Sequence, residues 1–347
     1  MNAPWLYSRL ADCIFILAPA FFVSLLVELL PTQWLEHQKI DAWAWLLLVV
    51  GVDVAHVYST LWRTYFDPEA MRRYRSLLIG IPVACWIGGV VLYTMGPLVF
   101  WRVLAYVAVW HFIRQQYGFL RLYSRREPLS WTRYLDGAAV YLATLYPLVY
   151  WHAHGRSFQW FVKGDFVGSA VPLLVEQVVF FVYVAVLALY FGKELARGWD
   201  FNIPRSLIVL GTATSWYCGI VRHDGDLAFT ATNVVAHGVP YMALVWIYQH
   251  KQKPASESHS IFLRRWFRPS LIPVYGGVVI AFAYFEEGIW DALVWRDHGL
   301  FYGWLAGIPR IEDPLLLAML VPLLALPQAT HYVLDGFIWK VREMRGA

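Results

Sequence analysis

Apolar runs of about 20 residues recur along the whole chain, and they restrict its fold more than any other feature. A helix of about 20 apolar residues is long enough to cross the hydrocarbon core of a bilayer. Charged residues make up only 15% of the 347 residues, which is too few for the surface of a soluble protein. The sequence therefore predicts an all-α, polytopic transmembrane helix bundle that forms a single integral membrane domain over residues 1–347.

The apolar runs predict about ten spans. These cover residues 11–30, 41–62, 77–95, 98–120, 132–150, 171–192, 203–221, 227–249, 270–294 and 315–339. With the N-terminus inside, 20 of the 28 Lys and Arg residues fall on the inner side and 7 on the outer side. This bias predicts cytoplasmic N- and C-termini. The basic residues lie in loops rather than along one face, so no nucleic-acid partner is expected.

The stretch 315–342 changes character within its span. It begins as an apolar helix and then carries Gln328, Thr330, His331 and Asp335 where the bilayer should still surround it. His331 and Asp335 are four residues apart and share one helix face. Ionisable groups inside a membrane are costly and usually have a functional partner.

Three further histidines fall within predicted spans, namely His56, His111 and His237. All four histidine-bearing spans are even-numbered and run from outside to inside. The first basic residue beyond the inner end of the span follows His56, His111, His237 and His331 after seven, ten, fourteen and nine residues, respectively. At a rise of 1.5 Å per residue, the four imidazoles lie roughly 10–21 Å from the inner ends of their helices, in the cytoplasmic half of the bilayer.

Carboxylates accompany two of these histidines. Asp53 precedes His56 by three residues, and Asp335 follows His331 by four. Imidazole and carboxylate together suit iron, zinc or manganese, and helix bundles often build metal sites from such inward-facing pairs. A lone histidine in a span can instead be a hydrogen-bonded packing residue. We therefore predict one metal site, with the ligands His56, His111, His237, His331, Asp53 and Asp335.

Two other polar residues near the histidines are candidate catalytic groups. Arg114 lies three residues after His111, where it would either pair with Asp53 or Asp335 or balance the charge of a metal–oxygen species; we favour the pair. Tyr241 lies four residues after His237 and would be a hydrogen-bond donor beside the metal.

The cysteines and the acidic residues of the outer side are given plainer roles. Cys13, Cys85 and Cys218 lie in apolar segments without a CxxC motif, so we expect small core residues rather than ligands. Glu286 and Asp291 lie near the outer end of their span, where we expect them to be solvated.

The histidine pattern resembles a known family. The order His56, His111 (in WHF), His237 and His331, followed by Asp335 and FIWK, is similar to that of the bacterial membrane-integral Brp/Blh-type carotenoid dioxygenases. The resemblance covers four short islands over about 280 residues. It implies retinal-forming chemistry at a non-haem iron held by histidines from several helices.

The chain departs from the family pattern at three positions. Tyr241 stands where a second histidine is expected, and Thr60 and Gln115 stand where acidic residues are expected. The chain is also longer, with about ten spans.

The leading functional hypothesis is that the chain is an intramembrane non-haem iron oxygenase, hydroxylase or desaturase-like enzyme. Dioxygen would be the cosubstrate, and a lipid or an isoprenoid such as a carotenoid would enter from the bilayer, with electrons from an external donor where needed. One iron would favour a dioxygenase and two a di-iron hydroxylase or desaturase. The alternatives are a transporter that uses the cluster as a proton or ion site, and a redox protein with bis-histidine haem. We expect the chain in the bacterial inner (plasma) membrane.

Overall fold

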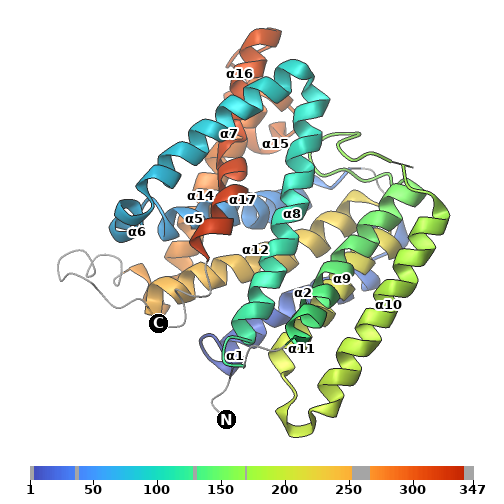
Figure 1. Cartoon of the computed structure of the whole chain (residues 1–347). Coiled ribbons are helices and arrows are strands. Elements are labelled where there is room, and N and C mark those ends of the chain that lie inside the picture. The colour runs from blue at the N-terminus through green and yellow to red at the C-terminus, as the bar shows by residue number, and fades with distance from the viewer. Residues whose placement is uncertain (1–3, 36–38, 128–130, 169, 252–265, 340–347) are drawn as a thin grey trace. The chain divides into compact units, whose positions relative to one another are not determined.

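A computed structural model describes residues 4–35, 39–127, 131–168, 170–251 and 266–339 (Figure 1). All regular secondary structure in these ranges is helical, as the apolar runs predict. By its contacts the chain divides into two compact units. Unit 1 comprises residues 1–40, 109–240 and 339–346, and unit 2 comprises residues 41–108, 241–338 and 347. Whether they function as the predicted single membrane domain stays a prediction.

Unit 1 contains the N-terminal helix and the middle of the chain. Its elements are α1 (Arg9–Asp12), η1 (Cys13–Leu17), α2 (Ala18–Leu29), α3 (Thr32–Leu35), the later part of α8 (Pro97–Tyr123), α9 (Thr132–His154), α10 (Leu173–Ala196), η3 (Gly198–Asp200), α11 (Ile203–Trp216), η4 (Tyr217–Arg222) and the first part of α12 (Asp226–Lys251). Helix α9 packs against α10 and α11, and α11 also packs against α2. The rings of Tyr146 and Tyr183 stack between α9 and α10 at a centroid distance of 5.3 Å.

Unit 2 contains the second predicted span and the C-terminal helices. Its elements are α4 (Ala42–Trp45), η2 (Leu46–Val54), α5 (Ala55–Arg63), α6 (Pro68–Arg73), α7 (Arg75–Met95), the first part of α8, the last part of α12, η5 (Pro269–Leu271), α14 (Ile272–Trp290), η6 (Asp291–Trp295), α15 (Gly299–Tyr302), η7 (Gly303–Leu305), α16 (Pro314–Leu324) and α17 (Leu326–Ile338). Helix α14 packs against η2 and α5, and α7 packs against α16 and α17.

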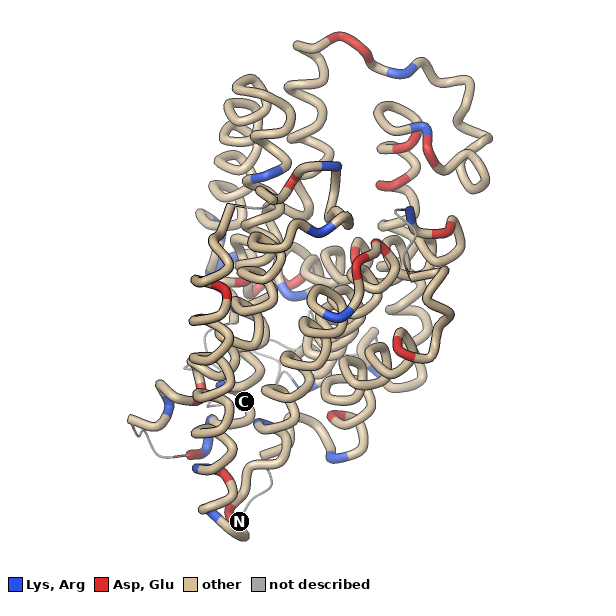
Figure 2. The backbone as a smooth tube through the Cα atoms, turned by 90° about the vertical axis from the view of Figure 1, so that its right-hand side faces the viewer, with Lys and Arg blue, Asp and Glu red and all other residues tan. Residues whose placement is uncertain are grey.

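Several of these helices have the length and composition of membrane spans. Five segments qualify, namely Arg9–Leu29, Ala42–Arg63, Arg75–Met95, Leu173–Ala196 and Pro269–Trp295, and the bent pair α16 and α17 would make a sixth. Figure 2 shows how few charged residues such helices carry, and α7 has none after Arg75. All ten predicted spans fall on helices of the structure. The chain is therefore a candidate membrane protein, while the count of ten spans stays a prediction.

The last predicted span is two helices rather than one. Helices α16 and α17 meet at Ala325 with a bend of 43°. Pro327 lacks the N–H that would continue the helical hydrogen bonds, which explains why a straight helix does not form there. Helix α7 approaches α16 closely at Gly89, where a Cβ atom would lie 2.7 Å from Cβ of Pro322. Only glycine fits this contact.

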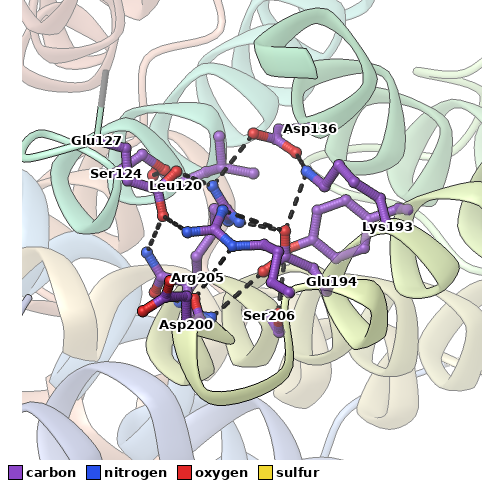
Figure 3. Close-up of polar contacts among 12 residues, drawn as sticks. Leu120, Ser124, Glu127, Asp136, Lys193, Glu194, Asp200, Arg205 and Ser206 are labelled. Carbon is purple, nitrogen blue, oxygen red and sulfur yellow. Dashed lines mark hydrogen bonds and ion pairs between the residues drawn. The ribbon is translucent and has the colours of Figure 1, made fainter. Parts of the chain in front are cut away.

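A cluster of six charged residues, here called the ionic cluster, ties α9, α10 and α11 together (Figure 3). It consists of Glu127, Asp136, Lys193, Glu194, Arg197 and Arg205. The guanidinium of Arg205 is 1% exposed and contacts the carboxylates of Glu127, Asp136 and Glu194. Three acidic and three basic groups balance in charge, which is the arrangement that buried ions require.

The expectation that Glu286 and Asp291 are solvated is wrong. Both side chains are buried in unit 2. Oε1 of Glu286 accepts hydrogen bonds from Gln328 Nε2 at 2.9 Å and from Trp290 Nε1 at 3.3 Å. Their place near the end of a predicted span suggested contact with water, whereas packing against neighbouring helices covers them.

Candidate metal centre

The predicted metal ligands are distributed over both units. His111 and His237 belong to unit 1, and His56, His331, Asp53 and Asp335 belong to unit 2. Each unit brings its two histidines together, and all four imidazoles are buried. The sharing of one metal by both pairs stays a prediction.

The histidine pair of unit 1 joins α8 to α12. Nε2 of His111 lies 3.2 Å from Nε2 of His237, and the two rings are nearly perpendicular at 78°. Without a metal, one Nε2 must carry a proton and donate it to the other. With a metal, both Nε2 lone pairs would point at the ion.

The chain around His237 fixes the position of its ring. The ring stacks on Phe112 at a centroid distance of 3.5 Å and an interplanar angle of 7°. Pro240 has no N–H to donate to the carbonyl of Ala236 one turn earlier, and Nε2 of Gln116 donates to that carbonyl instead at 3.3 Å. The neighbouring Gln115 donates to the carbonyl of His237 at 2.8 Å. Two side-chain amides of α8 thus donate hydrogen bonds to backbone carbonyls of α12 close to its proline.

The histidine pair of unit 2 joins α5 to α17. The ring centroids of His56 and His331 lie 4.9 Å apart at an angle of 74°, and a nitrogen of each ring lies within 4.8 Å of one of the other. His56 is the second residue of α5, which follows directly on the π-helix η2. Short π-helical turns inside helices often occur at functional sites, because the wider turn redirects the following side chains.

A chain of hydrogen bonds leads from His331 to Asp335. Oγ1 of Thr60 lies 2.7 Å from Nδ1 of His331 and 3.0 Å from the hydroxyl of Tyr241, which donates to Oδ1 of Asp335 at 2.6 Å. The hydroxyl of Tyr241 donates its proton to Asp335, so it can only accept from Thr60. The hydroxyl of Thr60 therefore donates to Tyr241 and accepts from Nδ1–H of His331. This order places the proton of His331 on Nδ1 and the lone pair on Nε2, the nitrogen that would bind a metal.

Both predicted aspartates lie beside their histidines without a close hydrogen bond to them. Oδ1 of Asp53 is 3.7 Å from Nδ1 of His56, and Oδ1 of Asp335 is 3.8 Å from Nδ1 of His331. Hydrogen bonds through Tyr241 and Thr60 link Asp335 to His331. A direct ligand role for either aspartate stays a prediction.

Tyr241, one of the two candidate catalytic residues, contacts the histidines of its own unit. Its ring lies edge-on to His331 at 4.9 Å. Arg114 is exposed and donates to the hydroxyl of Tyr141 on α9 at 2.7 Å. Its predicted pairing with Asp53 or Asp335 stays a prediction.

The sequence analysis did not predict that Thr60 and Gln116 contribute to the site. Thr60 stood out only as a departure from the resembled family, yet its hydroxyl group lies 3.0 Å from that of Tyr241. The spacing was the available signal, because each follows a histidine by four residues and so shares its helix face.

Comparisons of the chain with protein-family models, with curated proteins and with solved structures find no match. The resemblance to the Brp/Blh-type dioxygenases stays a prediction.

Proposed function

We propose that the chain is an intramembrane non-haem iron oxygenase, hydroxylase or desaturase-like enzyme that acts on a lipid or isoprenoid. The observation that carries this proposal is the 3.2 Å separation of the two buried Nε2 atoms of His111 and His237. The proposal includes three predictions from the sequence, namely ten spans, cytoplasmic termini and a site in the cytoplasmic half of the bilayer.

The spacing of that pair distinguishes between two kinds of metal site. With metal–nitrogen bonds of about 2.0–2.1 Å, two neighbouring ligands of one ion lie about 3.0–3.4 Å apart, and two ligands on opposite sides lie about 4.0–4.2 Å apart. Axial haem ligands occupy opposite sides of the iron. The observed 3.2 Å suits two neighbouring ligands and so favours a non-haem ion over bis-histidine haem.

The pair of unit 2 supports the same donor chemistry. A histidine that binds a metal through one nitrogen usually donates its other N–H to a fixed acceptor. Thr60 is that acceptor for His331, and Tyr241 and Asp335 hold Thr60 in turn. These three side chains would position the imidazole, while Asp53 would do so for His56 or bind the ion itself.

From the pattern of the sequence, we infer that both histidine pairs bind the same metal centre. The four histidines lie on spans of one direction at one depth, and one pair alone supplies only two protein ligands. The donor set is imidazole and carboxylate without thiolate, which suits iron, with zinc or manganese as the other candidates. Bound iron would supply the activation of dioxygen.

The surroundings of each pair would serve this chemistry by excluding water. All four imidazoles are at least nine-tenths buried, and aromatic rings, among them Phe112 and Tyr241, pack on them. A dry site protects reactive oxygen species from side reactions. An apolar substrate would enter sideways from the bilayer. Any reducing equivalents would come from an external donor.

The test is the metal content of the detergent-purified chain. We expect about one or two irons per chain and no haem absorption in the wild type, and no iron in either His237→Ala or His331→Ala. His152→Ala is the matched control, because this histidine donates to the carbonyl of Leu148 in its own helix and belongs to neither histidine pair. Retention of half the metal in each variant would indicate separate sites.

Absence of metal from the wild type after reconstitution with iron would overturn the proposal. With iron present, oxygen uptake is measured on adding extracted membrane lipids or a carotenoid. Uptake that persists in His331→Ala would contradict a role for the centre in the reaction.

A further inference from the structure

A second group of potential ligands lies in unit 1, apart from the histidines of the proposed iron centre. Glu28 is next to the last residue of α2, Cys218 lies in η4, and His223 directly follows η4. One ligand atom from each of the three lies within 4.8 Å of the others. Glu28 is half exposed, Cys218 is buried and His223 lies between these extremes.

Two distances within this group are close to the edges of a tetrahedral metal site. Sγ of Cys218 lies 3.6 Å from Oε1 of Glu28, and Nε2 of His223 lies 3.0 Å from the same oxygen. Bonds of about 2.3 Å to sulfur and 2.0–2.2 Å to nitrogen or oxygen give tetrahedral edges of about 3.5–3.7 Å and 3.3–3.5 Å. The two edges at Glu28 therefore need shifts of only a few tenths of an ångström, and the ligand atoms of Cys218 and His223 lie within 4.8 Å of each other.

The local backbone brings the thiol and the imidazole to the same carboxylate. Helix α11 continues into a π-helix, η4, and ends where His223 turns to extended backbone. His223 is the fifth residue after Cys218, and both side chains reach Glu28. Such a π-helical turn at the end of a helix is common at functional sites.

A cavity beside the group leaves room for a fourth ligand. Its volume is about 590 Å³, and its walls include Glu28, Cys218 and Arg222 together with Tyr183 and Tyr217. Catalytic zinc sites have three protein ligands and an open position for water or substrate. The cavity provides such a position.

The positive charge of Arg222 would repel a metal ion bound between Glu28, Cys218 and His223. Nε of Arg222 lies 3.7 Å from Oε1 of Glu28, but the Arg222 side chain is 62% exposed. An exposed arginine in a surface ion pair gains little from it, so a divalent ion can replace the arginine at small cost. The displaced guanidinium would then line the cavity, where it suits an anionic substrate group or a lipid headgroup.

We propose that Glu28, Cys218 and His223 form a second metal site that takes a divalent transition metal of the zinc class, with its fourth position open to the cavity. On binding, the proton of the Cys218 thiol passes to solvent, and the thiolate, the neutral imidazole and the carboxylate hold the ion. Zn²⁺ accepts this mixed donor set without a redox requirement.

The test uses Co²⁺ as the probe on the full-length chain in detergent after removal of metals. A thiolate bound to Co²⁺ gives a near-ultraviolet charge-transfer band that imidazole and carboxylate ligands do not give. We expect this band to saturate, to be displaced by Zn²⁺ and to be absent in Cys218→Ser.

Controls separate this site from the proposed iron centre. Cys85→Ser should keep the band, because Cys85 lies in unit 2 and belongs to no such group. His331→Ala should also keep it, so failure of the iron centre does not affect this result. Glu28→Gln and His223→Ala should weaken Co²⁺ affinity at least about tenfold, because even loss of an outer hydrogen-bond partner costs 10–100-fold.

The proposal is overturned if no band forms in wild type, or if the band survives in Cys218→Ser. Unchanged affinity in both Glu28→Gln and His223→Ala overturns it as well. The three groups would then form only a hydrogen-bonded cluster. Size-exclusion elution at the wild-type position shows that each variant is folded.

Discussion

The hydrogen bond between Thr60 and His331 predicts a specific defect in metal binding for Thr60→Val. Valine has nearly the shape of threonine, so the buried site keeps its packing and loses only the hydroxyl. Nδ1–H of His331 then lacks the acceptor that now lies at 2.7 Å. The imidazole can instead place its proton on Nε2, where it competes with the metal.

The size of the effect follows from the two kinds of contact that are lost. A buried donor without an acceptor costs about 1–3 kcal/mol, and loss of the outer hydrogen-bond partner of a metal-binding histidine weakens affinity about 10–100-fold. The second figure corresponds to about 1.4–2.8 kcal/mol, so the two agree. We expect a 10–100-fold weaker affinity for iron with unchanged stoichiometry. Tyr241→Phe should have a smaller effect in the same direction, because Thr60 remains but is no longer oriented by the tyrosine.

The assay is competition for Fe²⁺ between the purified chain and a chelator of known affinity. Thr64→Val is the matched control, because Thr64 directly follows α5, is also buried, and has a hydroxyl that donates to the carbonyl of Thr60 at 2.7 Å. The reasoning is refuted if Thr60→Val binds iron as tightly as Thr64→Val and the wild type do.

Two further predictions concern the ionic cluster. Arg205→Met leaves three carboxylates with two cations, and removal of one partner from a buried ion pair costs about 3–5 kcal/mol, so denaturant unfolding in detergent should show a loss of this order. Lys163→Gln, at an exposed position, should change stability by less than about 0.5 kcal/mol, and equal stability of both variants would contradict a structural role for the cluster. Burial raises the pKa of Glu127, but the Asn202 hydrogen bond and the charges of Arg205 and Arg197 outweigh it, so the pKa lies below the ordinary value of 4.5. This stabilisation is therefore complete above pH 4.5 and is lost as the pH falls through the lowered pKa; the free energy of unfolding should fall less steeply over this range in Glu127→Gln, and equal slopes would exclude the effect.

The sequence by itself determined the helical class and the residues around which the site is built. Apolar runs of membrane length have few structural solutions, because a bilayer leaves no backbone group unpaired, and every predicted span is helical in the structure. The periodicity of a helix also fixed the local pairs. Spacings of three and four residues predicted that Asp53 lies beside His56 and Asp335 beside His331, and both pairs are within 4 Å.

Contacts between segments far apart in the chain were decided only by tertiary structure. The spacing of His331 and Asp335 predicted only that they share a helix face, and it gave no sign of Thr60, which lies 271 residues away in the sequence and 2.7 Å from Nδ1 of His331. Likewise, the sequence predicted that Cys218 is a small core residue, because nothing in its own segment indicates that Glu28 lies beside it. Local spacing determines which side chains share a helix face, but only the packing of helices determines what that face meets.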